Sequence, residues 1–485
     1  MPKVPAVRLT ATLLAAVAFT GCTATPEPPA PPGTTGSAPP EVEGAEGAEG
    51  IGDPYYPDDG NGGYDVTDYA VGISYDPAAR RLDGDTTVTA RATADLSRFN
   101  LDLTGFDVSR VEVDGVEAGT ERSGEHELVI TPATPVVKGE EFTTRVVYSG
   151  EPQAEPDGDL GTNGWQVSTS GGAYAAGEPH SASSWYPVND HPRDKATFSV
   201  RARVPDGWSV VSNGREEPPK PEGGWTTFTW VEPNPVAPYV TTVAIDRWTI
   251  VRSTLPGGVP LVDAYAPGTE RKRAEEERLP EVLAFLADRF GPYPQSGAGG
   301  IFLNENIGFS LEIQGRPIYA KWADLDTIVH EQAHQWYGDS VSVESWADIC
   351  LNECFASYAQ WLWDESANRV DLDARFRATV SKTARNTRYW NRKLYDMGPG
   401  NEFTAVYDKG QLAMHALRRR IGEDAFSTLL KRWASTHRDG NASWPQFEDM
   451  AVEVSGQADL RPFLTAWFRD AAKPEDRYLF PGTLR

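Results

Sequence analysis

The feature that most constrains this chain is the run His-Glu-Gln-Ala-His over 330–334, in which His330 and His334 stand four positions apart. On an α-helix this spacing places both imidazoles on one face, while Glu331 lies about 100° around the helix axis. Residues 326–329 lead into the run, and Gly338 follows it as a residue suited to ending a helix. The sequence therefore predicts a helix that carries two nitrogen ligands and one further carboxylate.

A second amphipathic stretch, over 346–364, carries Glu353, with 18 residues between it and His334. Zinc in a hydrolase takes three nitrogen or oxygen ligands from the protein and keeps one position open for water. We predict one Zn²⁺ per chain, held by His330, His334 and Glu353. Glu331 would then assist the attack of zinc-bound water on a carbonyl carbon and protonate the leaving amine. The alternative, two structural histidines and a surface glutamate, requires three independent features to coincide.

The N-terminus has the pattern of an export signal, with Lys3 and Arg8 before an apolar run over 9–19 that is too short to span a bilayer. The small residues directly before Cys22 resemble the lipobox of bacterial lipoproteins. Residues 1–22 are therefore predicted to be a lipoprotein-type signal that leaves a lipid anchor on Cys22. The protein is expected on the outer face of a bacterial cell membrane; an ordinary secretory signal would instead make it secreted.

Composition changes sharply after this signal. Residues 23–62 are rich in Pro, Gly, Glu, Ala and Thr and are predicted to form a disordered tether. In the whole chain Asp and Glu outnumber Lys and Arg by 70 to 45, which gives a net charge of −25. This acidity argues against nucleic acid as a partner, and contact with a membrane is expected only through the lipid anchor.

The remainder predicts an α+β multidomain protein. Over 63–250, short runs with period-2 alternation, such as Phe99, Leu101 and Leu103, are separated by Gly and Pro turns and predict an all-β domain. Over 251–485, helical patterns predominate, so the second domain is expected to be mostly α and to carry the chemistry.

Two cysteines, Cys350 and Cys354, flank Glu353. Four positions apart on one helix, they have marginal geometry for a disulfide, so two reduced and buried side chains are expected. Export would keep a bridge possible.

The stretch HEQAHQWYGDSVSVESWADICLNECFASY resembles the aminopeptidase N family of gluzincin metallopeptidases, which also includes leukotriene hydrolase. That family has HExxH, 18 residues, and then Glu in an Asn-Glu-x-Phe context, which residues 352–355 reproduce. WYPVNDHPRDKATF over 185–198 and VYDKG around Tyr407 are similar to two further family segments. The resemblance, over about 63–480, implies a saddle-like β domain followed by a thermolysin-like catalytic domain. The chain looks like a short form that lacks the C-terminal helical domain of longer relatives, which implies a more open cleft.

The same resemblance implies three more site residues. Tyr407 stands where the family has its transition-state donor. Glu312 aligns with the carboxylate that grips the free amine of the substrate, although Phe309 and Ile313 replace the glycine and asparagine of that motif. Glu178, nine residues before Pro187, matches a second contact that the β domain lends to the same amine.

These features favour an aminopeptidase that removes N-terminal residues from peptides with a free amine. Two alternatives remain open at this point. The altered amine motif and the open cleft would suit a zinc endopeptidase, and the scaffold would also suit a peptide-binding surface lipoprotein with weak or lost activity. The sequence carries no signal of oligomeric state.

Overall fold

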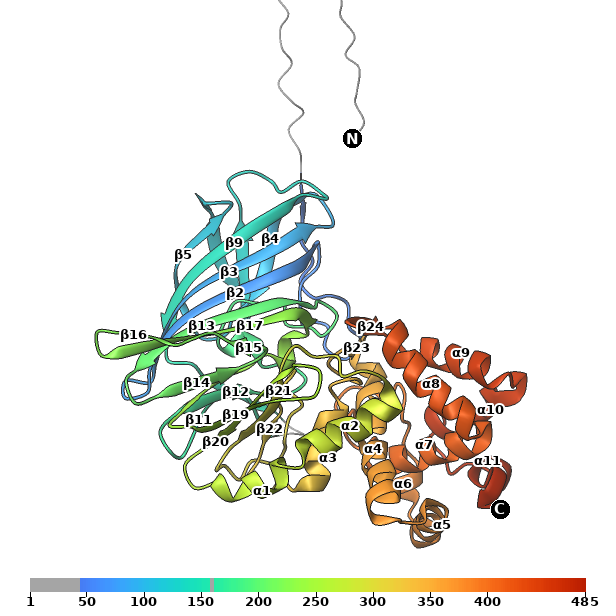
Figure 1. Cartoon of the computed structure of the whole chain (residues 1–485). Helices are drawn as coiled ribbons and strands as arrows, with labels where there is room; N and C mark the ends of the chain where they lie inside the picture. Colours follow the sequence, from blue (N-terminus) through green and yellow to red (C-terminus); the bar gives the residue numbers. More distant parts are fainter. Residues whose placement is uncertain (1–43, 158–160) are drawn as a thin grey trace, which may run out of the picture. The chain divides into compact units, whose positions relative to one another are not determined.

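The computed structural model describes residues 44–157 and 161–485, and these described residues belong to one compact unit. Strands dominate its N-terminal part and helices its C-terminal part (Figure 1), in the order that the sequence predicts. No helix within the described ranges has both the length and the apolar composition that crossing a bilayer demands.

A nine-stranded sheet forms the body of the N-terminal part. Along β2 (Tyr64–Asp76) buried side chains such as Tyr69, Val71 and Ile73 alternate with more exposed ones, because successive residues of a strand face opposite sides of the sheet. The other strands of this sheet are β3 (Arg81–Ala92), β5 (Asp107–Val113), β6 (Val116–Glu117), β9 (Glu141–Gly150), β13 (Ala196–Pro205), β15 (Arg215–Glu216), β16 (Lys220–Glu222) and β17 (Trp225–Val236).

Two smaller sheets complete the β domain. A four-stranded sheet has the order β1-β4-β8-β7, and a five-stranded sheet has the order β10-β11-β12-β18-β14. The first contains β1 (Ala45–Glu46), β4 (Leu96–Asp102), β7 (Gly119–Ser123) and β8 (Glu127–Thr131). The second contains β10 (Ala154–Asp157), β11 (Gly161–Val167), β12 (Ala173–Ala176), β14 (Ser209–Ser212) and β18 (Val243–Asp246).

Residues 44–62 differ from the disordered tether that composition predicts. The carboxylate of Asp53, 1% exposed, accepts hydrogen bonds from the backbone N–H of Tyr55 at 2.7 Å and of Trp346 at 3.0 Å. It also lies 3.2 Å from His191 Nε2. The segment packs because a few side chains among its glycines and prolines find buried partners, which composition does not register. Residues 1–43, with the predicted signal and Cys22, lie outside the described residues.

A four-stranded sheet begins the C-terminal part, which the sequence predicts only as mostly helical. Its strands are β19 (Thr249–Thr254), β20 (Pro260–Tyr265), β21 (Ala298–Phe302) and β22 (Ile318–Tyr319). The pairs β20–β21 and β21–β22 are parallel, and β21 and β22 are buried throughout. Short strands buried on both faces lack the alternation by which a strand is recognised in sequence.

Helices make up most of the rest, with a two-stranded pairing of β23 (Val341–Val343) and β24 (Gly440–Ala442). They are α1 (Arg273–Glu276), α2 (Leu279–Phe290), α3 (Leu325–Ala333), α4 (Cys350–Asn368), α5 (Leu372–Thr383), α6 (Thr387–Trp390), α7 (Asp408–Ile421), α8 (Glu423–Thr436), α9 (Trp444–Ser455), α10 (Arg461–Leu464) and α11 (Asp476–Leu479).

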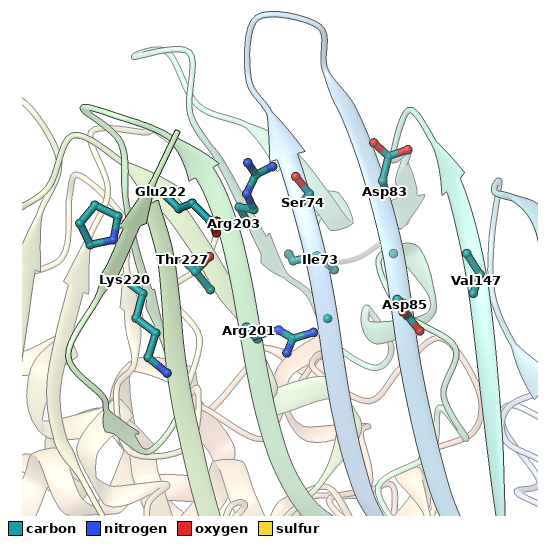
Figure 2. A pocket seen from close by; sticks show the side chains of 13 residues that line it. Ile73, Ser74, Asp83, Asp85, Val147, Arg201, Arg203, Lys220, Glu222 and Thr227 are labelled. Carbon is teal, nitrogen blue, oxygen red and sulfur yellow. The ribbon is translucent and has the colours of Figure 1, made fainter. Parts of the chain in front are cut away.

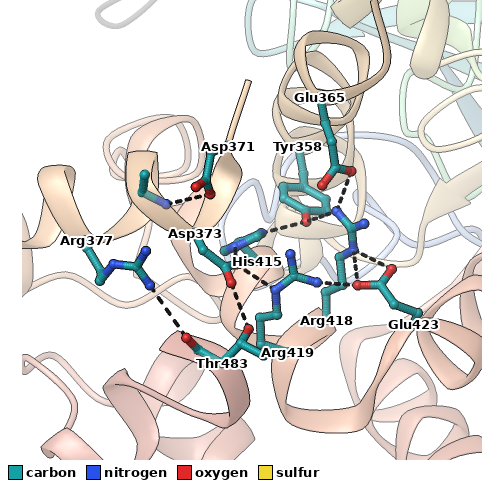
Figure 3. Close-up of polar contacts among 11 residues, drawn as sticks. Tyr358, Glu365, Asp371, Asp373, Arg377, His415, Arg418, Arg419, Glu423 and Thr483 are labelled. Atoms are coloured by element: carbon teal, nitrogen blue, oxygen red, sulfur yellow. Dashed lines mark hydrogen bonds and ion pairs between the residues drawn. The ribbon is translucent and has the colours of Figure 1, made fainter. Parts of the chain in front are cut away.

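A polar network ties the C-terminal end to α5 and α7 (Figure 3). Asp373 accepts from His415 Nε2 at 2.9 Å, from Arg419 Nε at 2.6 Å and from Thr483 Oγ1 at 2.7 Å. Burial lowers the pKa of His415 to about 4, so its ring is neutral and Nδ1 accepts from the hydroxyl of Tyr358 at 2.9 Å. The network holds α7 to α5 and to the C-terminal segment around Thr483.

Candidate metal and peptide site

Helix α3 presents the two histidines. It begins after Asp324, whose carboxylate accepts from the backbone N–H of Thr327 at 3.1 Å, a capping arrangement that fixes where the helix starts. His330 lies in its last turn and His334 directly follows its last residue. The two Nε2 atoms lie 3.1 Å apart.

Helix α4 brings the third group. Glu353 Oε2 lies 3.2 Å from His330 Nε2 and 3.7 Å from His334 Nε2. A tetrahedral ion with bonds of about 2.0–2.2 Å holds its ligands about 3.3–3.6 Å apart, so this triangle of donor atoms fits zinc. Glu353 Oε2 is buried and has no hydrogen-bond partner in the described part of the chain. Its lone pairs are therefore free to bind a metal ion.

A backbone contact on the Nδ1 side of the ring fixes the orientation of His334. Its Nδ1 lies 2.9 Å from the backbone oxygen of Tyr337. Because a carbonyl only accepts, Nδ1 carries the proton and Nε2 presents its lone pair to the metal position. Gly338 makes this possible, since its φ of +133° turns the chain and a Cβ there would lie 3.3 Å from His334 Nδ1.

The carboxylate of Glu331 is 6% exposed and lies within 4.8 Å of donor atoms of Glu312 and His334. Burial raises its pKa well above the usual value, the charge of His334 opposes that rise, and Glu312 and Glu353 add to it. At Glu353 burial also raises the pKa, but His334 and His330 outweigh it and lower the value to about 2. The site therefore gathers the buried carboxyl groups of Glu312, Glu331 and Glu353 around its two imidazoles.

Glu178 and Glu312 form a second group of carboxylates beside the triad. With Glu353, their oxygens lie within 4.8 Å of one another. Glu178 follows β12 in the β domain and is 3% exposed, while Glu312 lies between β21 and β22 and is 2% exposed. Glu312 accepts from the hydroxyl of Tyr239 at 3.0 Å, but Glu178 Oε1 is buried with no partner among the described residues. Burial, then Glu312 and Glu353, raise the pKa of Glu178 well above its usual value.

Tyr407 stands directly before α7, its ring centroid 6.0 Å from that of His330 and the residue 37% exposed. Desolvation, followed by the charge of Glu353, raises the pKa of Tyr407 well above its usual value, so its hydroxyl keeps its proton. Helix α7 packs closely on α4 here, since a Cβ at Gly410 would lie 2.8 Å from Cys354 Sγ.

The cysteines are bonded to each other, contrary to the expected reduced pair. Cys350 and Cys354 form a disulfide with Cα atoms 4.8 Å apart, and both side chains are fully buried. One helical turn brings the two Cα atoms into the range that a disulfide spans, so the spacing is permissive.

The sequence analysis missed two residues that orient the site. Tyr239 binds Glu312, and Gln335 Nε2 donates to the backbone oxygen of Glu312 at 3.2 Å while its Oε1 accepts from Gly315 N at 2.6 Å. Gln335 directly follows the His-Glu-Gln-Ala-His run, and this position was the sequence signal that could have identified it as a site residue. Nothing in the sequence marks Tyr239, because its contact spans 73 residues.

A separate hollow of about 880 Å³ lies on the nine-stranded sheet, where β2, β3 and β13 meet the hairpin of β16 and β17 (Figure 2). Its lining mixes the cations of Arg201, Arg203 and Lys220 with the carboxylates of Asp83, Asp85 and Glu222. It contains none of the predicted site residues and no histidine or cysteine, so the hollow is separate from the candidate site.

Two family models match the chain: the peptidase M1 N-terminal domain over residues 65–240 and the peptidase family M1 domain over residues 311–467. The chain belongs to peptidase family M1. Among solved structures, an M1 zinc metallopeptidase from Deinococcus radiodurans has 30% identity and a TM-score of 0.80, and the match covers 88% of this chain and 99% of that one. The structure of a mutant of that protein with a bound Tyr-Ser-Ala substrate is also 30% identical in sequence to this chain, with a TM-score of 0.80. The predicted family and fold, a β-rich domain followed by a helical catalytic domain in the two-domain form, are confirmed.

Curated relatives of this M1 chain are longer. Aminopeptidase N of Streptomyces lividans is 25% identical over 325 residues, 58% of this chain and 36% of its own length. Aminopeptidase N of Lactococcus lactis is 24% identical over 449 residues, 84% of this chain and 50% of its own length. The chain thus spans half or less of these relatives.

Proposed function

We propose that this M1 chain is a zinc aminopeptidase that removes N-terminal residues from peptides with a free amine. The observation that carries the proposal is the convergence of Glu178 and Glu312 beside the triad, with only one hydroxyl, that of Tyr239, donating to the pair within the described residues. Two buried carboxylates next to each other are costly unless one is protonated or a cation joins them, and the ammonium group of a peptide is such a cation.

Zinc held by His330, His334 and Glu353 would supply a Lewis acid that activates water and polarises the scissile carbonyl. Glu331 accepts a proton from the attacking water and passes it to the nitrogen of the breaking C–N bond, so that a carboxylic acid and an amine leave. Tyr407 donates to the oxygen that becomes negative in the transition state.

Glu312 and Glu178 set where the peptide is cut. By binding the α-ammonium group, they hold the first peptide bond against the metal position and leave room for a single residue before it. Tyr239 and Gln335 keep Glu312 in place. The relatives that are named aminopeptidases, and the related structure solved with a tripeptide, support peptides as the substrate class.

The test compares zinc-loaded wild type with Glu331→Gln on an aminoacyl amide and on its N-acetylated counterpart, before and after chelation. Glu277→Gln, with a side chain 70% exposed, is the matched control. The expected result is zinc-dependent cleavage of the free amine alone, lost in Glu331→Gln and kept in Glu277→Gln. Equal cleavage of the blocked peptide would make the enzyme an endopeptidase, and no cleavage by zinc-loaded protein would overturn the proposal.

We also propose export and lipid anchoring through Cys22, on the strength of the charged start, the apolar run over 9–19 and the small residues before the cysteine. Expression in a bacterium with labelled fatty acid should label the wild type and leave Cys22→Ser unlabelled. A wild-type protein that stays unlabelled and appears in the medium would leave secretion as the only form of export.

A further inference from the structure

A second group of potential metal ligands lies in the β domain. Asp102 ends β4 and Glu127 begins β8, and the two residues are opposite each other in the antiparallel pair. With His126, they place one ligand atom each within 4.8 Å of the others. The group lies in the four-stranded sheet, apart from the zinc motif and from the peptide-binding carboxylates.

Among the described residues, no hydrogen bond accounts for the burial of the Glu127 carboxylate. It is 6% exposed, and both of its carboxylate oxygens are buried without a partner among the described residues. The amide of Asn100 lowers its pKa but does not reach hydrogen-bond geometry, since Asn100 Nδ2 is also without an acceptor there. A buried carboxylate in this condition is costly unless it is neutralised or bound.

Asp102 is held rigidly beside it. Its Oδ1 accepts from Asn61 Nδ2 at 3.1 Å and its Oδ2 from the backbone N–H of Asp190 at 2.7 Å. Each oxygen keeps a further lone pair, so both hydrogen bonds are compatible with metal binding. His126 Nε2 lies 3.2 Å from the backbone oxygen of Asp58, which brings another oxygen to the same edge.

Positive charge is scarce around the pair. Among the described ion pairs, Asp102 takes part in none and Glu127 only in one, with His126 Nε2 at 3.9 Å. Burial raises the pKa of Asp102 well above its usual value, and the charges of Glu127 and Asp190 raise it further. Burial is also the main cause that raises the pKa of Glu127 to about 7.

We propose that Asp102, Glu127 and His126 bind a divalent cation, with the backbone oxygen of Asp58 as a further ligand. Carboxylate and carbonyl oxygens suit Ca²⁺ and Mn²⁺, and an imidazole at the same site favours Mn²⁺ over Ca²⁺. Ligands on opposite sides of Ca²⁺ stand about 4.6–5.2 Å apart. The ligand atoms of Asp102, Glu127 and His126 lie within 4.8 Å of one another, close enough to contact one such ion. The cation would tie residues 58–61 to β4 and β8, and this role is independent of the proposed peptidase activity.

The experiment titrates zinc-loaded wild type with MnCl₂, and in a separate arm with CaCl₂, while metal per chain and thermal unfolding are measured. Glu127→Gln removes the charge but no hydrogen bond, so it is expected to fold. Glu121→Gln is the matched control, because Glu121 lies on the neighbouring β7 and its side chain is 68% exposed.

The expected result is one equivalent of Mn²⁺ in addition to retained zinc, with a melting temperature raised by several degrees in wild type and Glu121→Gln but not in Glu127→Gln. Binding of Ca²⁺ in its place, with the same dependence on Glu127, would also support the site and assign it to the oxygen ligands alone. If neither cation binds the wild type, or if a cation that binds the wild type binds Glu127→Gln equally well, the proposal is overturned.

Discussion

The two ends of the M1 site are built in opposite ways. At the metal end, three donor atoms 3.1–3.7 Å apart come from α3 and the adjoining α4, and the imidazoles lower the pKa of Glu353. At the amine end, Glu178 and Glu312 come from different domains, and burial together with their mutual repulsion raises the pKa of Glu178. Under the proposed function, one cation completes the metal end, whereas the amine end requires a second cation, which a peptide substrate would bring.

The largest effect should come from breaking the metal end. Glu353→Ala removes one of three ligands, so we expect bound zinc to be lost and hydrolysis to fall by at least about 10³-fold. Elemental analysis and the hydrolysis rate measure the two effects, with Glu277→Gln as control. Full zinc content together with normal turnover would show that Glu353 is not a ligand.

Tyr407→Phe should lower kcat by about 10²–10³-fold with KM almost unchanged, because its hydroxyl is used only when the oxyanion forms. Steady-state kinetics on an aminoacyl amide separates the two constants. An increase in KM with kcat preserved would instead assign Tyr407 to substrate binding.

At the amine end, Tyr239→Phe removes the hydroxyl that donates to Glu312. A hydrogen bond to a charged group contributes about 1.5 kcal/mol at the lower end of its range, which corresponds to about tenfold in kcat/KM. We expect that loss for free-amine substrates, with zinc content unchanged. Loss of zinc from Tyr239→Phe would show that the amine end and the metal end do not act independently.

The smallest catalytic effect is expected at the disulfide. Replacing Cys350 and Cys354 by alanine opens a short loop, so the free energy of unfolding should fall by about 2 kcal/mol. The packed helix α4 as a whole orients Glu353, so turnover and zinc content should change little. Denaturant unfolding and elemental analysis of the double variant give the two quantities, and loss of zinc would show that the bridge itself positions Glu353.

The metal end and the amine end also differ in how far the sequence predicts them. The proximity of His330 and His334 was predictable because i,i+4 spacing places both on one helix face. Glu353 was proposed as their partner from the 18 residues that separate it from His334. Glu178 and Glu312 were found only through family resemblance, since loops carry no periodicity. The contact of Tyr239 with Glu312 could not be predicted from the sequence, because the two residues are 73 positions apart and meet only in the folded chain.

The fold was predictable to a similar degree. Alternation identified the long strands of the β domain, but the short parallel strands β20 to β22 carry no such pattern. Composition also assigned residues 44–62 to the tether, although Asp53 is buried against the backbone of Trp346.

The central claim, that a carboxylate pair reads the substrate amine, is tested most directly by Glu312→Gln. The measurement is kcat/KM for an aminoacyl amide and for its α-hydroxy counterpart, which lacks the cation, in wild type and variant. The account predicts a loss of about 2 kcal/mol or more, roughly 30-fold, for the amine substrate alone. An equal loss for both substrates would contradict it, because Glu312 would then support the structure of the site without recognising the amine.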